Sequence, residues 1–257
     1  MKTIISLSIF SIKENIKSRI YLVLTIFSSL IIFIGLLLTG LSGFEQPQRV
    51  LVDSGLAIIE LFSLLVIVAN SSNIVLQDIE SKSIYLVLSK PVSRTKYVIG
   101  KYLGFLGVGL VSIVVMSTVH LLVIFTYGWK VSVVEYLLVV VGIMLKTGII
   151  SAVSLFLIVA MTSQTVAMIT SLLIWVGGHF LVEFKFIMDR ISSGVIKVLS
   201  LVIYYLIPNF QYFNLKDYFG NKYLVPSFSL WAGVLYWFGY VSIVMLLTVW
   251  IFKRKNL

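Results

Sequence analysis

Long runs of apolar residues constrain the fold of this chain more than any other feature of its sequence. Hydrophobic residues make up 60% of the chain and charged residues only 12%, whereas a soluble domain of this size needs more polar residues to cover its surface. A run of about 20 apolar residues spans the hydrocarbon core of a bilayer, which is roughly 30 Å thick. The sequence therefore predicts an all-α integral membrane protein with one transmembrane domain over residues 1–257. We predict six spans, at residues 20–41, 54–76, 98–127, 136–160, 165–182 and 229–252.

The distribution of basic residues predicts how these spans are oriented. Because six is an even number, both termini lie on the same side of the membrane. That side carries twelve Lys and Arg residues against three acidic residues, and the opposite side carries seven against six. Since loops rich in Lys and Arg stay in the cytoplasm, we expect both termini there. The net charge of +10 is then mainly a consequence of topology, and we expect no nucleic-acid partner.

The start of the chain predicts a helix that lies in the membrane surface. Four isoleucines at helical spacing share one helix face, while Lys13, Glu14 and Lys17 fall on the other side. A basic amphipathic segment of this kind is typical of an interfacial helix, which we predict for residues 1–19. A frayed basic tail is the alternative.

A long segment on the outer side, residues 183–228, precedes the last predicted span. Within it, the stretch at residues 191–207 is apolar enough to suggest a seventh span. Two observations argue against that span. Four polar residues at helical spacing give the stretch a polar face. A seventh span would also place the basic C-terminus outside. We therefore predict a re-entrant or interfacial helix that ends at Pro208.

The sequence lacks the motifs of a nucleotide-hydrolysing enzyme. Gly100-Lys101 is similar to the end of a phosphate-binding loop, but Thr95 replaces the first glycine of that motif and Tyr102 replaces its final Ser or Thr. The chain therefore does not bind ATP by that route. The common zinc-protease and serine-hydrolase motifs do not occur either. We expect no enzyme activity in this chain.

A metal or cofactor site is not expected. Cysteine is absent, which excludes disulfides and thiolate ligands. The two histidines, His120 and His179, lie in different predicted spans without an i,i+4 partner. We expect hydrogen-bonded side chains at both positions rather than metal ligands.

Three ionisable residues, Glu60, His120 and Lys146, lie inside the predicted spans at depths within about 6 Å of one another. A lone lysine near the middle of a membrane helix costs roughly 2.5–3.5 kcal/mol, so Lys146 should face a partner or water. We predict that Glu60 and Lys146 form an intramembrane pair in the outer half of the bundle, with His120 near it. The sequence leaves two roles open: a polar patch that lines a substrate path, and a structural pair that holds two helices together.

A polar island at residues 77–101 separates the second and third predicted spans. Its first segment, residues 77–88, suits a short amphipathic helix that Pro91 ends, and Ser93 can cap the helix that follows. This helix–turn–helix can insert its apolar residues into a groove of a cytoplasmic partner or lie on the membrane surface. The sequence leaves both possibilities open.

Two glycines mark the start of the third predicted span. Gly100 and Gly104 form a G-x-x-x-G pattern, and small residues allow the backbones of membrane helices to approach closely. We predict a close helix–helix contact at this pair, within the chain or across a dimer.

The island resembles the corresponding loop in the permease subunits of type-two ABC exporters. The matching residues are an acidic run, a turn and a Gly-Lys pair, namely Asp78-Ile79-Glu80, Leu88-Ser89-Lys90-Pro91-Val92-Ser93-Arg94 and Gly100-Lys101-Tyr102. The basic start, the six spans and an outer segment with Ile207-Pro208-Asn209-Phe210 match as well, so the resemblance covers the whole chain. One departure is Lys82-Ser83-Ile84, where the family often has Gly-Thr.

This resemblance implies a division of labour between subunits. The membrane subunit forms the path, and a separate cytoplasmic ABC ATPase subunit hydrolyses ATP. Two membrane subunits, either two copies of this chain or one copy and a related permease, pair with two ATPase subunits in the inner membrane of a prokaryotic cell. Residues 77–97 would be the cytoplasmic coupling segment between the second and third spans. Its ATPase-coupling residues would be Asp78, Glu80, Ile84, Leu88, Pro91 and Arg94.

We therefore expect a permease subunit of an ABC exporter, without a cofactor of its own. A non-transporting membrane anchor or assembly factor that docks a cytoplasmic protein on the same island is the alternative. An intramembrane enzyme using Glu60, Lys146 and His120 is the least favoured function, because these residues lie in separate helices without motif spacing. No residue pattern in the predicted spans identifies the transported substrate.

Overall fold

The computed structural model of the chain describes residues 8–9, 26–27, 29–35, 37, 47–80, 93–161, 163–191, 194–218 and 230–254. The secondary-structure elements within these ranges are all helical. In chain order they are α3 (Pro47–Glu80), α5 (Arg94–Thr126), α6 (Val133–Ala160), α7 (Gln164–His179), α8 (Leu181–Met188), α9 (Gly194–Leu206), the 3-10 turns η1 (Phe210–Phe213) and η2 (Leu215–Tyr218), and α10 (Leu230–Arg254).

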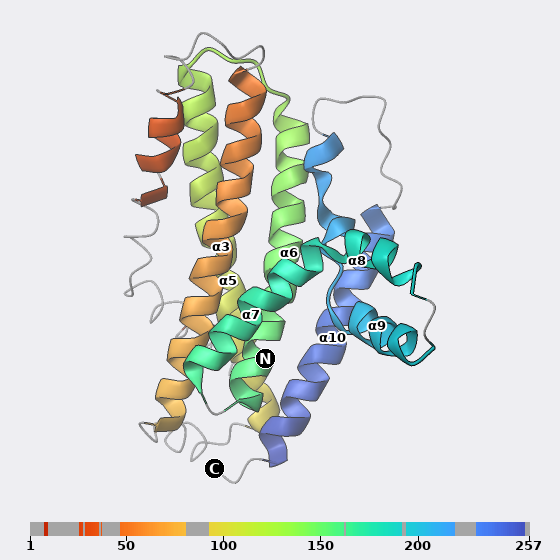
Figure 1. Ribbon diagram of the computed structural model, residues 1–257. Helices are drawn as coiled ribbons and strands as arrows, with labels where there is room; N and C mark the ends of the chain where they lie inside the picture. The colour runs from red at the N-terminus through yellow and green to blue at the C-terminus, as the bar shows by residue number, and fades with distance from the viewer. Residues whose placement is uncertain are drawn as a thin grey trace.

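Long helices build the body of the molecule. α3, α5 and α6 run side by side in alternating directions, and α10 crosses the lower half of the bundle in Figure 1. α6 is the central helix, because it packs against α3, α5, α7 and α10. We call the end where α5 and α7 begin the Arg94 end of the bundle, and the opposite end, where α3 begins, the Pro47 end.

The helices are long and apolar enough to cross a membrane several times. Five of them meet this criterion within the described residues, or up to six if the bent pair of α7 and α8 forms one span. The prediction of an all-α, multi-pass membrane protein is therefore confirmed. The first predicted span, residues 20–41, lies only partly within the described ranges, where residues 29–35 are helical.

α3 begins earlier than the sequence predicts. The predicted second span starts at residue 54, whereas the helix starts at Pro47, and proline is well suited to a first helical position. Within the next two turns, Arg49 Nε lies 3.6 Å from Asp53 Oδ2, with both side chains about half exposed. Such an i,i+4 pair supports a helix beyond its apolar run by about 0.3–0.5 kcal/mol. A boundary drawn from hydropathy alone misses this charged start of the helix.

The segment between α6 and α10 departs most from a set of simple spans. α7 and α8 meet at a bend of 67°, so the predicted span at residues 165–182 is not one straight helix. α9 has 13 residues and is about 20 Å long, shorter than the hydrocarbon core of roughly 30 Å. With the residues that follow it, Gly194–Phe213 meets the length and composition criterion for a span. The re-entrant or interfacial path over residues 183–228 stays a prediction.

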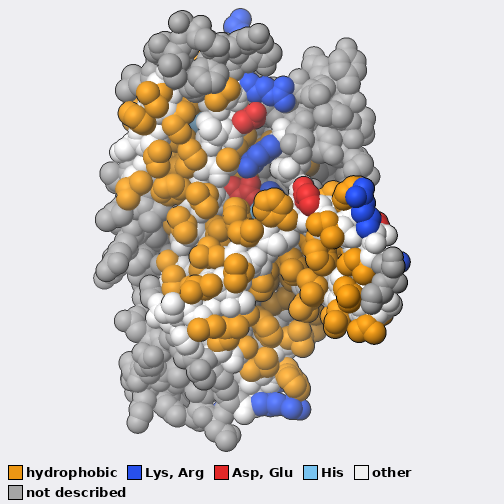
Figure 2. Space-filling view, viewed as in Figure 1, with side chains coloured by type: hydrophobic (Ala, Val, Ile, Leu, Met, Phe, Trp, Pro, Cys, Tyr) orange, Lys and Arg blue, Asp and Glu red, His pale blue; other side chains and the backbone are white. Residues whose placement is uncertain are grey.

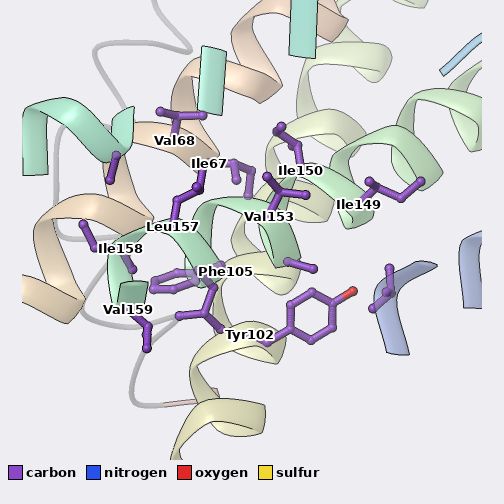
Figure 3. Close-up of a cluster of buried hydrophobic side chains, with 14 of the residues drawn as sticks. Ile67, Val68, Tyr102, Phe105, Ile149, Ile150, Val153, Leu157, Ile158 and Val159 are labelled. Atoms are coloured by element: carbon purple, nitrogen blue, oxygen red, sulfur yellow. The ribbon is translucent and has the colours of Figure 1, made fainter. Parts of the chain in front are cut away.

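Two hydrophobic clusters fill the bundle. The cluster nearer the Arg94 end draws buried residues from α3, α5 and α6, including Tyr102, Phe105 and Leu157 (Figure 3). The cluster nearer the Pro47 end includes Leu56 and Tyr136. Glycine allows one close contact between the three helices, because a Cβ added at Gly109 would lie 2.7 Å from Ile67 Cδ1 and 3.0 Å from Thr147 Cγ2.

The cap predicted for the helix after the island is confirmed. Ser93 is the N-cap of α5, and its hydroxyl oxygen accepts a hydrogen bond of 3.3 Å from the backbone N–H of Lys96. Gly100 and Gly104 are both buried in this helix. The Gly100 carbonyl accepts a hydrogen bond of 3.3 Å from the Ser8 hydroxyl.

Several predicted features lie outside the described residues. These include residues 81–92, and with them Ile84, Leu88 and Pro91. The backbone of Asp78 and Glu80 belongs to the end of α3, so the predicted helix at residues 77–88 starts as a continuation of that long helix. Of the predicted interfacial helix at residues 1–19, only residues 8 and 9 are described.

Candidate functional site

The carboxylate of Glu60, on α3, contacts nitrogen atoms from three other elements. Lys146 Nζ, on α6, and His179 Nε2, at the end of α7, each lie 2.8 Å from Glu60 Oε1. Lys216 Nζ, in η2, lies 2.8 Å from Glu60 Oε2. One carboxylate therefore joins four elements that are distant in sequence. We call Glu60, Lys146, His179 and Lys216 the Glu60 cluster.

The Glu60 cluster forms a polar layer between the two hydrophobic clusters. On α3, Ile59 belongs to the hydrophobic cluster at the Pro47 end, and Leu64 belongs to the one at the Arg94 end. A second pair of polar side chains lies in the same interval, where the hydroxyl groups of Ser63 and Thr147 are 3.3 Å apart. The two halves of the apolar core are thus separated by groups that need hydrogen-bond partners.

The depth of the cluster follows from the lengths of the helices. Glu60 and Lys146 each lie about 20 Å along their helices from the Pro47 end. α7 starts at the opposite end and has 16 residues, so its last residue, His179, lies about 24 Å along it. α7 therefore ends at the level of the ion pair, and Figure 1 shows this end midway along the bundle.

The hydrogen bonds of His179 show where a proton must lie. Its Nδ1 is 2.9 Å from the carbonyl oxygen of Trp175, and because a carbonyl oxygen only accepts, Nδ1 carries a hydrogen and donates it. Nε2 lies 2.8 Å from Glu60 Oε1. Nε2 also lies 3.2 Å from Lys146 Nζ, so Nε2 either donates a hydrogen of its own to the carboxylate or accepts one, from the Lys146 ammonium group or from a protonated carboxyl group.

The basic side chains of the cluster lie near the carboxyl end of α7. That end carries about half a negative charge from its aligned peptide dipoles, and cations beside it are favourable by roughly 0.3–1 kcal/mol. Inside a membrane the last carbonyl groups of a helix also need donors. Gln211 Nε2 supplies one of them, with a hydrogen bond of 2.7 Å to the carbonyl oxygen of His179. This bond helps the helix to end inside the bundle.

The segment that returns from α9 toward the Pro47 end is held by α10 as well as by α7. The hydroxyl group of Tyr236, on α10, accepts a hydrogen bond of 2.9 Å from the backbone N–H of Asn209. The hydroxyl group of Tyr240 donates one of 2.9 Å to the carbonyl oxygen of Leu206. These two tyrosines bond the backbone at the place where α9 ends.

Two glycines let this returning segment pack closely on the helices. A Cβ added at Gly142 of α6 would lie 2.5 Å from the carbonyl oxygen of Phe213, and one added at Gly178 of α7 would lie 2.5 Å from that of Pro208. Real Cβ contacts are not that short, so both positions require glycine while the segment keeps this path. The close packing brings η2, with Lys216, to the bundle beside Glu60.

The members of the cluster differ in exposure. The side chains of Lys146 and Glu60 are 3% and 6% exposed, whereas those of Lys216 and His179 are 20% and 24% exposed. In the space-filling view, basic and acidic side chains follow one another from the top of the molecule toward its middle, where they lie beside hydrophobic side chains (Figure 2). The cluster thus has a buried side and a side open to its surroundings.

His120 is not the histidine that contacts Glu60. Its Nδ1 lies 3.0 Å from the hydroxyl oxygen of Tyr136, and its Nε2 lies 3.3 Å from the carbonyl oxygen of Leu51. A Cβ added at Gly55 would overlap the imidazole ring, so this glycine makes room for the histidine between the helices. His120 therefore bonds to residues nine and ten positions before Glu60 and Lys146 on α3 and α6, nearer the Pro47 end, and His179 is the histidine that contacts the ion pair.

At the Arg94 end, the start of α5 is joined to the end of α10. Arg94 Nη1 donates hydrogen bonds of 3.1 Å to the carbonyl oxygens of Phe252 and Lys253. The rings of Tyr97 and Phe252 stack, with centroids 5.5 Å apart. Of the six predicted coupling residues, Arg94 is thus the one whose side chain the structure describes, and that side chain bonds to the last turn of α10.

A comparison with protein families identifies the class of this bundle. The sequence pattern of the family described as ABC-2 family transporter protein matches residues 11–257. The chain belongs to this family. A comparison with curated proteins gave no match.

Membership in the ABC-2 family confirms the resemblance seen in the sequence. The chain is the membrane domain of an ABC transporter, and its apolar helices make it a multi-pass membrane protein. In this ABC-2 protein, no group of three or more His, Cys, Asp or Glu side chains among the described residues is arranged to hold a metal ion.

Sequence reasoning missed two members of the cluster in this ABC-2 protein. The sequence places His179 close to the outer end of a full span, but α7 ends midway along the bundle. The topology places Lys216 among the basic residues of the outer segment, whereas η2 brings it to Glu60. The single signal in the sequence is charge: an acidic residue and a lysine within apolar spans, in a chain with a strong excess of basic residues.

Proposed function

We propose that this ABC-2 family chain is the permease subunit of an exporter, and that a separate cytoplasmic ATPase subunit drives it. Two permease subunits, either two copies of this chain or one copy and a related permease, would form the path. Both termini would be cytoplasmic, in the inner membrane of a prokaryotic cell. The excess of Lys and Arg on the terminal side supports this orientation.

The junction between α5 and α10 carries the proposal. The predicted coupling segment, residues 77–97, leads directly into α5, and Arg94 bonds to the carbonyl oxygens of the last turn of α10. A force applied to this segment by an ATPase would therefore act on α5 and α10 together. Transport by alternating access needs such a rigid link between the site of ATP hydrolysis and the membrane helices.

A separate ATPase is supported by the sequence of the island. Thr95 and Tyr102 replace two required residues of the phosphate-binding loop, so ATP hydrolysis would come from another chain. The Glu60 cluster supports a transporter over a simple membrane anchor. A buried polar cluster is costly in a membrane, and intramembrane ionisable groups mark substrate or ion pathways by default.

The proposal is tested by co-expressing the chain with candidate ABC ATPase subunits. We expect an ATPase that contains the G-x-x-x-x-G-K-[ST] motif to copurify and to hydrolyse ATP in proteoliposomes. Replacing Leu88 by Asp should leave membrane insertion intact and should separate ATP hydrolysis from transport. Failure of the correctly folded chain to bind any such ATPase would contradict the proposed function.

A further inference from the structure

The charges within the Glu60 cluster do not balance. Two ammonium groups, those of Lys146 and Lys216, bond to the single carboxylate of Glu60. Even when His179 is neutral, these side chains carry two positive charges against one negative charge. The carboxyl end of α7 offsets about half a charge. Within these four side chains and the helix end, the positive charge exceeds the negative charge.

The donors in the cluster are already arranged around a carboxylate. Three nitrogen atoms, from α6, α7 and η2, lie 2.8 Å from the two oxygens of Glu60. These are the short distances of charge-assisted hydrogen bonds. A ligand that carries a carboxylate or phosphate group would meet the same donors, either beside Glu60 or in its place.

The open side of the cluster is the side on which a ligand can approach. Lys216 and His179 are the two partly exposed members. Next to His179 the surface is apolar, since Val176 is 43% exposed and Phe180 is 59% exposed. A ligand at this place would have its anionic group against Lys216 and His179 and its apolar portion against α7 or the surrounding lipid.

We propose that the Glu60 cluster is a binding site for the anionic group of an amphipathic substrate, with Lys216 and His179 as the residues that contact it. The claim that the bound group belongs to a transported substrate rests on the proposed transport function, whereas the claim that the cluster binds an anion does not. A bound anion would compete with Glu60 for Lys216 and His179. It would thereby loosen α3 from the segment that contains η2.

Binding can be measured on the full chain in phosphatidylcholine nanodiscs. The ring of Trp175 lies 4.5 Å from that of His179, so a bromine atom bound here should quench its fluorescence. The probe is a long-chain fatty acid brominated close to its carboxyl group, and the control is the alcohol with the same brominated chain. The difference in quenching between the wild type and the Trp175→Phe variant isolates the signal of Trp175.

We expect the quenching of Trp175 to reach a plateau as the fatty-acid concentration rises. The alcohol should quench Trp175 only as much as a brominated compound dissolved in the surrounding lipid. Lys216→Gln should weaken fatty-acid binding about tenfold, the effect of losing one charge-assisted contact, and Lys216→Arg should retain most of it. Lys197→Gln is the matched control, because Lys197 is an exposed residue of α9 and should leave binding unchanged. Glu60→Gln removes the competing carboxylate and should tighten binding.

Two results would overturn the proposal. One is equal quenching by the acid and the alcohol, and the other is wild-type binding by Lys216→Gln. Inorganic phosphate separates an amphipathic ligand from a free anion: we expect millimolar phosphate not to displace the fatty acid, and displacement by phosphate would contradict an amphipathic substrate. None of these measurements needs ATP or an ATPase, so loss of the binding site and failure of the transport function are observed separately.

Discussion

Lys216 Nζ lies 2.8 Å from Glu60 Oε2, although 156 residues separate the two in sequence. Lys146 and His179 contact the other oxygen of the same carboxylate. The contact with Lys216 joins the segment before α10 to α3. Breaking it requires either that Glu60 changes partners or that η2 moves away from α6.

The first prediction concerns the buried carboxylate. Replacing Glu60 by Gln leaves two lysines near a neutral amide, and removing one partner of a buried ion pair costs about 3–5 kcal/mol. We expect a clear loss of stability in thermal unfolding of the chain in detergent. Asp53→Asn is the control, because Asp53 forms an exposed i,i+4 pair with Arg49 whose loss costs at most about 1 kcal/mol. Equal stability of the two variants would contradict the central role of Glu60.

The second prediction concerns the packing of the returning segment on α6. A methyl group at Gly142 would lie 2.5 Å from the carbonyl oxygen of Phe213, so Gly142→Ala must displace that backbone. We expect a loss of about 1–3 kcal/mol, the usual cost of overpacking, in the same unfolding assay. Gly239→Ala is the matched control, since no atom lies within 4 Å of its added Cβ. In a helix, that change should stabilise the chain by up to about 1 kcal/mol.

The long helices and the need of Lys146 for a partner could be predicted from the sequence. Apolar runs are a local property of the sequence, and they indicated α5, α6 and α10. The cost of a buried charge is local as well, and it indicated that Glu60 approaches Lys146. The choice of histidine could not be predicted. Depth estimated from the predicted span ends placed His120 at the level of Glu60, but α3 begins before its predicted span. His120 bonds to Leu51 and Tyr136, nearer the Pro47 end than the ion pair.

The place of Lys216 depends on a path that has no sequence signal. It lies in a short 3-10 turn, and it reaches Glu60 because the chain before it packs against Gly142 and Gly178. Each glycine alone resembles any other glycine of a membrane helix. Their role depends on two backbone contacts between segments that are distant in sequence, which composition and periodicity do not record.

The third prediction concerns the hydroxyl group that bonds the backbone after α9. Tyr236→Phe removes the acceptor for the N–H of Asn209, and leaving a buried donor without a partner costs about 1–3 kcal/mol. We expect faster hydrogen exchange at residues 207–213 with little change in α5 and α6. Tyr205→Phe is the control, because Tyr205 is 76% exposed and its replacement should leave exchange unchanged. Uniformly faster exchange over the whole chain would instead indicate global destabilisation.

The fourth prediction concerns the junction at the Arg94 end. Arg94→Ala removes both hydrogen bonds to the carbonyl oxygens of α10, which leaves packing contacts, including the Tyr97–Phe252 stacking, to hold the two helices together. We expect the ends of α5 and α10 to separate more often. The chain has no cysteine, so one spin label on each helix can be introduced without removing native thiols, at Lys96 and Arg254.

Electron-electron distance measurements should then show a broader and longer distribution in Arg94→Ala than in the wild type. Arg94→Lys keeps the positive charge near the end of α10 but offers a single ammonium group instead of the guanidinium fork, and we expect an intermediate distribution. Lys130→Ala, at the opposite end of the bundle, is the control and should match the wild type. An unchanged distribution in Arg94→Ala would show that the packing contacts hold the two helices without these hydrogen bonds, and Arg94 would then have no role in transmitting motion to α10.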